Sequence, residues 1–273
     1  MRKLVLPFAL AAASASVSVP ATAQQAAATP PPPPPVTGNI TLATEYRFRG
    51  IDQTFGKPAI QGGFDYSHAS GIYLGNWNSN ISQGAGFPGG NIEMDFYGGY
   101  KHAFGDFGLD VGAIYYYYPG TDSGAGLIGA PFNNHTGAVH TGSVNNKEVY
   151  LGGSWKWLSA KWFYSLGDYF SAPDTKGSNY LDISGTFDLG GGWGVNAHYG
   201  HLQFKKMDNA SYNDWKLGGT KELAGWTLGA AYIGTSAKGD CAKGEFYCFP
   251  NASGTKARDA GRNTIVLSVG KTF

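Results

Sequence analysis

The chain has 273 residues, among them 42 glycines, and 15% of its residues are aromatic, but only 14% are charged and the formal net charge is +1. Soluble proteins carry about 25% charged residues, so this composition is not that of an ordinary soluble domain. The aromatic content argues against disorder, the low net charge argues against a nucleic-acid partner, and two cysteines cannot form a disulfide-dense scaffold or a cysteine zinc ribbon.

The N-terminus has the features of a secretory signal peptide. Arg2 and Lys3 precede an apolar stretch over residues 4–19, and Ala21-Thr22-Ala23 forms an A-x-A cleavage site. We therefore expect residues 1–23 to be removed after export. Residues 24–36 are rich in alanine and proline and are expected to form a stiff periplasmic leader, which leaves residues 37–273 for the folded domain.

Beyond the leader, no stretch reaches the roughly 18 apolar residues of a helical membrane span. Instead, apolar and polar residues alternate with a period of two, which places them on opposite faces of β-strands. The alternation is strong over 39–49, 92–101, 107–118 and 263–273, and weaker over 58–67, 71–80, 147–155, 160–170, 179–188, 193–202, 212–222 and 226–235. These twelve segments have about ten residues each, the length that a tilted strand needs to cross a bilayer.

The links between these segments alternate in length. Short links fall at 68–70, 102–106, 156–159, 189–192 and 223–225, and longer ones at 50–57, 81–91, 119–146, 171–178, 203–211 and 236–262. Tight turns at one end and long loops at the other are typical of transmembrane barrels. The sequence therefore predicts an all-β fold, an antiparallel up-and-down transmembrane β-barrel of twelve strands with both termini on the periplasmic side.

The placement of aromatic residues predicts two girdles at the membrane interfaces. The girdle at the short turns is assigned to Trp155, Trp157, Trp162, Trp193 and Trp226. The girdle near the long loops is assigned to Trp77, Trp215 and the run from Tyr115 through Tyr117 to Tyr118.

The polar faces of the strands are expected to line the lumen, because a charge facing lipid costs about 2–4 kcal/mol at the bilayer midplane. The lumen candidates are Glu45, Arg47, Arg49, Gln61, Asp65, Glu93, Asp95, Asp110, Glu148, Lys161, Asp182, His198, Asp214 and Lys216. Both signs of charge are present, so they can form an electrostatic constriction.

The number of strands alone does not determine whether the lumen is open. Barrels of about eight strands are filled by side chains, whereas those of sixteen or more hold water channels. Inner glycines favour the open interpretation because they leave room for water; they are Gly63, Gly99, Gly108, Gly112 and Gly152. A plugged interior, in which the charges simply satisfy one another, stays open as the alternative.

Cys241 and Cys248 lie in the last long link, and in an exported protein we expect them to form a disulfide. No G-x-S-x-G motif occurs, and His198 and His201 fall on opposite faces of a strand. We therefore expect no catalytic residue, no metal and no cofactor, with His135 and His140 of the third long link as a weak candidate metal pair.

Several segments resemble the TorF family of porins. The resemblance is carried by residues 42–54, 58–66, 71–80, 93–100 and 268–273, and its most specific part is the block Tyr46-Arg47-Phe48-Arg49-Gly50. It implies an outer-membrane barrel of a Gram-negative bacterium but does not define a solute. It also leaves the roles of links 119–146 and 236–262 undefined.

The sequence favours a porin that lets small hydrophilic solutes or ions diffuse through a narrow, mixed-charge lumen. One alternative is an outer-membrane barrel enzyme of the lipase or protease kind, and another is a plugged structural or adhesive barrel that acts through its outer loops. The expected partners are outer-membrane lipid, small solutes, and the barrel-assembly machinery acting on the final strand that ends at Phe273. The choice between monomer and trimer stays open.

Overall fold

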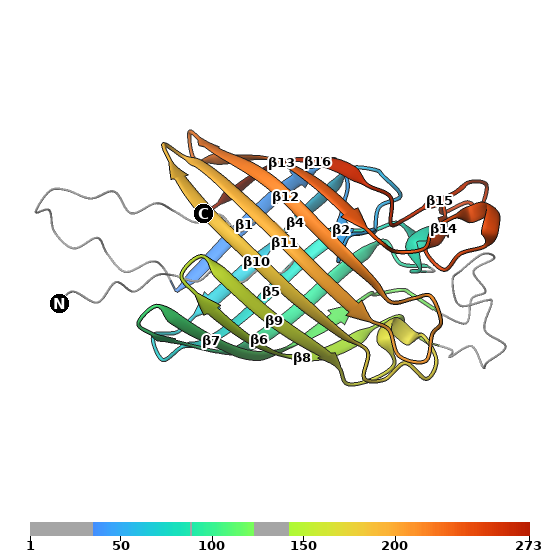
Figure 1. Ribbon diagram of the computed structural model, residues 1–273, viewed down its shortest axis with the longest axis horizontal. Coiled ribbons are helices and arrows are strands. Elements are labelled where there is room, and N and C mark those ends of the chain that lie inside the picture. Colours follow the sequence, from blue (N-terminus) through green and yellow to red (C-terminus); the bar gives the residue numbers. More distant parts are fainter. Residues whose placement is uncertain (1–34, 88, 123–141) are drawn as a thin grey trace, which may run out of the picture.

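The computed structural model describes residues 35–87, 89–122 and 142–273, so the predicted signal peptide, most of the leader and much of the third long link lie outside the described residues. Twelve tilted strands form a closed antiparallel barrel (Figure 1). They are β1 (Val36–Ala43), β4 (Ala59–Ser67), β5 (Ile72–Asn80), β6 (Ile92–Phe104), β7 (Phe107–Tyr117), β8 (Asn146–Trp155), β9 (Leu158–Ser165), β10 (Asn179–Gly190), β11 (Trp193–Gln203), β12 (Tyr212–Leu223), β13 (Trp226–Thr235) and β16 (Thr264–Thr272).

Each barrel strand pairs with its neighbour along the chain, and β1 pairs with β16 to close the sheet. Closure leaves the barrel without an exposed strand edge. The predicted fold class and the number of strands are therefore confirmed. The helical segments are short 3-10 turns, η1 (Gln83–Ala85), η3 (Tyr169–Ser171) and η4 (Cys241–Lys243), and no helix within the described ranges is long and apolar enough to cross a membrane.

The links alternate in length as predicted, with short turns at one end of the barrel and longer loops at the other (Figure 1). The beginning of β1 and the C-terminus lie at the short-turn end, where Phe273 N donates to Gly38 O. The last loop carries a small hairpin of β14 (Cys248–Pro250) and β15 (Ala257–Asp259) at the opposite end. Which end faces the periplasm stays a prediction.

The outer face of the barrel is apolar along its length, because alternate residues of each strand point outward. Large apolar side chains that remain exposed include Ile60, Phe64, Leu74, Phe96, Val111, Val149, Leu151, Leu181, Ile183, Leu217, Leu228, Ile265 and Leu267. A water-soluble protein rarely leaves such a continuous apolar surface uncovered. Hydrocarbon is therefore the environment that this surface fits.

The inner face is crowded by tyrosines, and the glycines do not leave space for water as the sequence suggested. A Cβ atom on Gly112 of β7 would lie 2.5 Å from the hydroxyl of Tyr150, and one on Gly99 of β6 would lie 2.7 Å from the hydroxyl of Tyr73. Each glycine makes room for an aromatic ring from a neighbouring strand. The prediction of an open lumen from inner glycines is therefore wrong at these positions.

This packing predicts that Gly112→Ala destabilises the barrel by about 1–3 kcal/mol, the usual cost of overpacking. The added methyl group would collide with the backbone carbonyl of Gly98 as well as with Tyr150. Gly153→Ala is the matched control, because its Cβ would meet nothing closer than Gly108 O at 3.9 Å. Urea unfolding in lipid vesicles measures both, and equal midpoints for the two variants would contradict the packing described above.

Candidate functional site in the lumen

The first predicted strand is shorter than the sequence suggested, and this changes the lumen. β1 ends at Ala43, and residues 44–58 leave the wall before β4 begins at Ala59. They contain a hairpin of two very short strands, β2 (Arg47–Phe48) and β3 (Ile51–Asp52). The predictions of a strand over 39–49 and of an outer loop over 50–57 are therefore wrong. We call residues 44–58 the plug segment.

The plug segment lies inside the barrel, since its contacts come from several sides of the wall. Tyr46 packs on Trp77 of β5 with ring centroids 5.2 Å apart. The hydroxyl of Tyr212 of β12 donates to Arg49 O at 2.9 Å. The alternation in this segment is real, but both of its faces are buried in the lumen, and the positive φ of Arg49 and Gly50 turns the chain out of strand geometry.

Arg49 is the main contact between the plug segment and the wall. Its guanidinium donates to both carboxylate oxygens of Glu148 on β8, at 3.0 and 2.7 Å. It also donates to the hydroxyl of Tyr169 at 2.8 Å and lies 4.3 Å from the ring centroid of Tyr180. The Arg49 side chain is 4% exposed and that of Glu148 is not exposed at all. A bidentate, buried pair of this kind fixes geometry and is costly to break.

A second set of ion pairs joins the plug segment to the last long loop. Arg47 Nη2 lies 3.1 Å from Glu45 Oε1, and Arg262 Nη1 lies 2.7 Å from Asp52 Oδ2. Arg262 also pairs with Glu45, and Arg47 donates to Ala260 O at 2.8 Å. The sequence analysis did not identify Arg262 or Asp52 as site residues. Each pairs with a residue near the opposite end of the chain, and no local pattern reports such a pair.

Further polar contacts cross the inner wall between strands. Lys161 Nζ lies 2.6 Å from Asp110 Oδ2, and Tyr97 donates to Asp65 at 2.7 Å. Gln61 donates more weakly to Ser79 at 3.4 Å. Several predicted lumen residues are therefore brought together as pairs within the interior.

His198 of β11 lies in a cluster that resembles a hydrolase site. Ser184 Oγ is 3.2 Å from His198 Nδ1, and His198 Nε2 is 2.8 Å from Asp214 Oδ2. However, Asp182 Oδ2 is also 3.2 Å from His198 Nδ1, and Ser184 donates to Asp182 at 2.5 Å. A histidine with a carboxylate at each nitrogen donates from both and cannot accept the proton of the serine. The cluster therefore does not fit nucleophilic catalysis.

The interior contains a cavity of about 210 Å³ between the plug segment and the walls, lined by both charged and aromatic side chains. The predicted residues that line it are Glu45, Arg47, Arg49, Gln61, Asp95, Lys161, Asp182, His198, Asp214 and Lys216. Four other predicted residues are not in its lining. Asp65, Asp110 and Glu148 accept hydrogen bonds from lining residues, and Glu93 accepts one from Tyr118, which lies at the second cavity described below. Their function in a pore stays a prediction.

A second, apolar cavity of about 80 Å³ lies at the long-loop end, and Phe48 lines both cavities. Its lining comes from the plug segment, from several long links and from the adjoining strand ends, and is mostly aromatic; it includes Phe87, Tyr118, Tyr169, Phe170, Phe204, Phe246, Tyr247 and Phe249. Burial raises the pKa of the Tyr247 hydroxyl in the last loop. The described loops thus pack over the end of the barrel, and we call this set the aromatic cap.

The structure corrects part of the girdle prediction. Tyr116, Tyr118 and Trp77 are buried in the interior. Trp162 does not border a short turn, because its indole nitrogen donates to Asn179, the first residue of β10, at the long-loop end. Tyr115 and Tyr117 are half-buried and their rings stack with centroids 5.9 Å apart.

Four tryptophans do lie beside the short turns with exposed rings: Trp155, Trp157, Trp193 and Trp226. Lysine ammonium groups lie over three of them: Lys156 is 5.0 Å from the ring centroid of Trp155, Lys221 is 4.7 Å from that of Trp193, and Lys271 is 5.3 Å from that of Trp226. An aromatic ring beside a lysine suits the headgroup level. Their role as a girdle stays a prediction.

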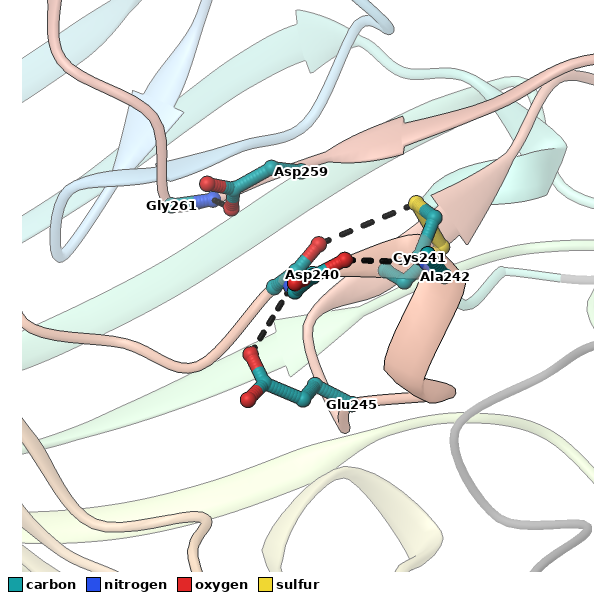
Figure 2. Close-up of a disulfide and its surroundings, with 8 residues drawn as sticks. Asp240, Cys241, Ala242, Glu245, Asp259 and Gly261 are labelled. Carbon is teal, nitrogen blue, oxygen red and sulfur yellow. Dashed lines mark hydrogen bonds between the residues drawn. A yellow bond between two sulfur atoms is a disulfide. The ribbon is translucent and has the colours of Figure 1, made fainter.

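The predicted disulfide between Cys241 and Cys248 is confirmed (Figure 2). Asp240, which precedes η4, accepts from Ala242 N at 2.9 Å, and Glu245 accepts from Asp240 N at 2.8 Å. A hydrogen bond from Lys243 lowers the pKa of the Asp240 carboxyl. No group of three or more metal-ligating side chains occurs among the described residues, and His135 and His140 lie outside them.

Residues 27–273 match the family model Gcw_chp, a bacterial protein family of unknown function. The chain belongs to this family. No curated protein matches the chain.

Solved structures similar to this Gcw_chp chain are barrels of low sequence identity. A KdgM porin is 9% identical with a TM-score of 0.48, covering 87% of this chain and 99% of its own. A NanC porin is 8% identical with a TM-score of 0.46, covering 86% and 98%. OmpT of Vibrio cholerae is 8% identical with a TM-score of 0.41, covering 87% and 97%.

Proposed function

We propose that this Gcw_chp protein is a porin of the outer membrane of a Gram-negative bacterium, through which small hydrophilic solutes or ions diffuse passively. The observation that carries the proposal is the contrast between an apolar outer face and an interior that holds a cavity with charged side chains in its lining. A protein that only filled its barrel for stability would gain more from apolar packing than from buried ion pairs. The proposal keeps the resemblance to the TorF family.

The plug segment makes the proposed pore narrow. Charged groups of both signs line the cavity beside it, so a permeating solute would exchange its hydration shell for these groups. In this proposal Glu45, Arg47 and Arg49 form the constriction, although they do not belong to the wall.

The proposed location follows from the same features. The signal peptide would export the chain, the proline-rich leader would remain in the periplasm with both termini, and the apolar face would contact lipid. The barrel-assembly machinery would bind the last strand, where Phe273 is 66% exposed. Neither a cofactor nor a metal is part of the proposed function.

Conductance in a planar lipid bilayer tests the proposal. Purified, folded protein is expected to give discrete current steps in KCl, and neutralising the constriction with Arg47→Gln is expected to change the step size. The matched control is Lys156→Gln, because Lys156 is exposed in a short turn with a weak pair to Asp106 at 4.0 Å. Complete absence of steps, in the wild type and in every variant that loosens the plug segment, would contradict a porin.

A closed structural barrel is the second candidate, and two observations favour it. The plug segment is held by a buried bidentate ion pair, and the aromatic cap packs at the long-loop end. An enzyme is the weaker candidate, because the carboxylates on both sides of His198 disfavour a general base. The conductance experiment separates the first two candidates.

A further inference from the structure

The charges inside the barrel are not balanced. Arg47, Arg49, Arg262 and Lys161 each lie within 4 Å of a carboxylate, as described above. The carboxylates in these pairs match the cations in number, so these groups contribute little net charge to the interior.

The cluster around His198 is also close to neutral. His198 lies between Asp182 and Asp214, and Lys216 lies opposite His198 in the register of β12 and β11. When the imidazole is protonated, two cations face two carboxylates.

The remaining charged groups of the described inner wall include Asp65, Glu93 and Asp95, against Lys101, and Asp188 and Glu222 fall on the same face nearer the short turns. Lys101 lies over the Tyr73 ring at 4.5 Å. Asp65 accepts only a neutral hydrogen bond, from Tyr97. The excess of the described interior is therefore negative.

Among the residues that the structure describes, Glu93 and Asp95 of β6 form no ion pair with a cation. They are 0% and 3% exposed. Tyr118 donates to Glu93 Oε1 at 2.8 Å, but Glu93 Oε2 and Asp95 Oδ1 have no hydrogen-bond partner among the described residues. Asp95 also lines the cavity beside the plug segment. A buried carboxylate oxygen without a donor is costly, and a cation in the cavity would remove that cost.

We infer that the lumen selects cations over anions, and that Asp95, which lines the cavity, determines this preference together with the field of Glu93 beside it on the inner face of β6. The inference rests on the proposed porin function and adds the class of ion. An unpaired carboxylate beside the narrowest part of a pore attracts a cation and repels an anion, as acidic rings do in cation channels. The paired groups discriminate less between cations and anions, because each already has a partner of opposite charge.

The test is the reversal potential of single barrels in a bilayer with a KCl gradient. The wild type is expected to give a permeability ratio of K⁺ to Cl⁻ above unity. Glu93→Gln with Asp95→Asn is expected to lower that ratio at least twofold, while the size of the barrel remains the same. Asp106→Asn is the matched control, because Asp106 is a carboxylate exposed in a short turn and paired with Lys156, and its removal should leave the ratio unchanged.

The outcomes separate the two proposals. Current steps with a ratio at or below unity overturn the cation preference and leave the porin function intact. An equal fall in the ratio for Asp106→Asn and for the double variant shows a general surface-charge effect and overturns the assignment to Glu93 and Asp95. Absence of current in the wild type and in a variant with a loosened plug segment contradicts both. Where the double variant does not fold, the sign of the wild-type reversal potential and the single Asp95→Asn variant still decide.

Discussion

Glu148→Gln is expected to increase the single-channel conductance of the barrel several-fold. The substitution leaves the guanidinium of Arg49 buried without its bidentate partner. Breaking a buried ion pair in this way costs about 3–5 kcal/mol, which lowers the ratio of docked to undocked plug segment by roughly a hundredfold or more. A plug segment that leaves the lumen opens the constriction, and conductance steps in a planar bilayer measure the change.

Two controls distinguish opening from general damage. Asp106→Asn removes a carboxylate from an exposed pair with Lys156, and exposed pairs contribute only about 0–1 kcal/mol, so conductance should not change. Arg49→Met with Glu148→Leu removes both charges and should return the conductance toward the wild-type value, because neither charge is then buried alone. A high conductance in the double variant as well would show that packing, and not the ion pair, holds the plug segment.

Leu151→Arg is expected to destabilise the folded barrel in lipid vesicles by about 2–4 kcal/mol, the cost of an arginine facing lipid near the midplane. Leu151 lies in the middle of β8 with its side chain 55% exposed on the outer face. Water would solvate an arginine there at little cost, whereas hydrocarbon would not. Urea unfolding in vesicles measures the free energy of unfolding for both proteins.

The matched control for this substitution is Ser253→Arg, in an exposed part of the last loop. Its free energy of unfolding should equal that of the wild type. If Leu151→Arg were as stable as the control, the apolar outer face would not contact lipid, and the proposed location in a membrane would be wrong.

The sequence alone was sufficient to predict the strands of the barrel wall and the short turns between them. A period of two in hydrophobicity is a local property, because successive side chains of a strand point to opposite faces whatever the rest of the chain does. The short turns were equally local, with positive φ at Gly105, Gly191 and Gly225. This is why the number of strands and the alternation of link lengths agree with the structure. Two predicted strands are too long, because the one over 160–170 ends at Ser165 and the one over 39–49 ends at Ala43.

The same local pattern failed over residues 44–49. Glu45, Arg47 and Arg49 alternate with aromatic residues as a wall strand would, but the structure buries both sets. An alternation with a period of two distinguishes the two faces of an extended segment. It does not determine whether either face contacts lipid. Only the closed barrel supplies an interior in which both faces can be covered.

The inner glycines and aromatic residues also show that a local sequence pattern does not determine tertiary contacts. Whether Gly112 leaves a void depends on Tyr150 of the neighbouring strand, and what the ring of Trp77 packs on depends on Tyr46 of the plug segment. These contacts join residues that are far apart in the chain, so no local pattern reports them.

The sequence by itself determined a twelve-strand barrel with an apolar exterior and a charged interior, since both follow from alternation along single strands. The tertiary structure decided what occupies the interior. The Arg49–Glu148 pair joins residues 99 positions apart, and the aromatic cap gathers side chains from separate links. Such long-range pairs form only when closure of the sheet brings distant strands around one lumen, and they determine how narrow that lumen is.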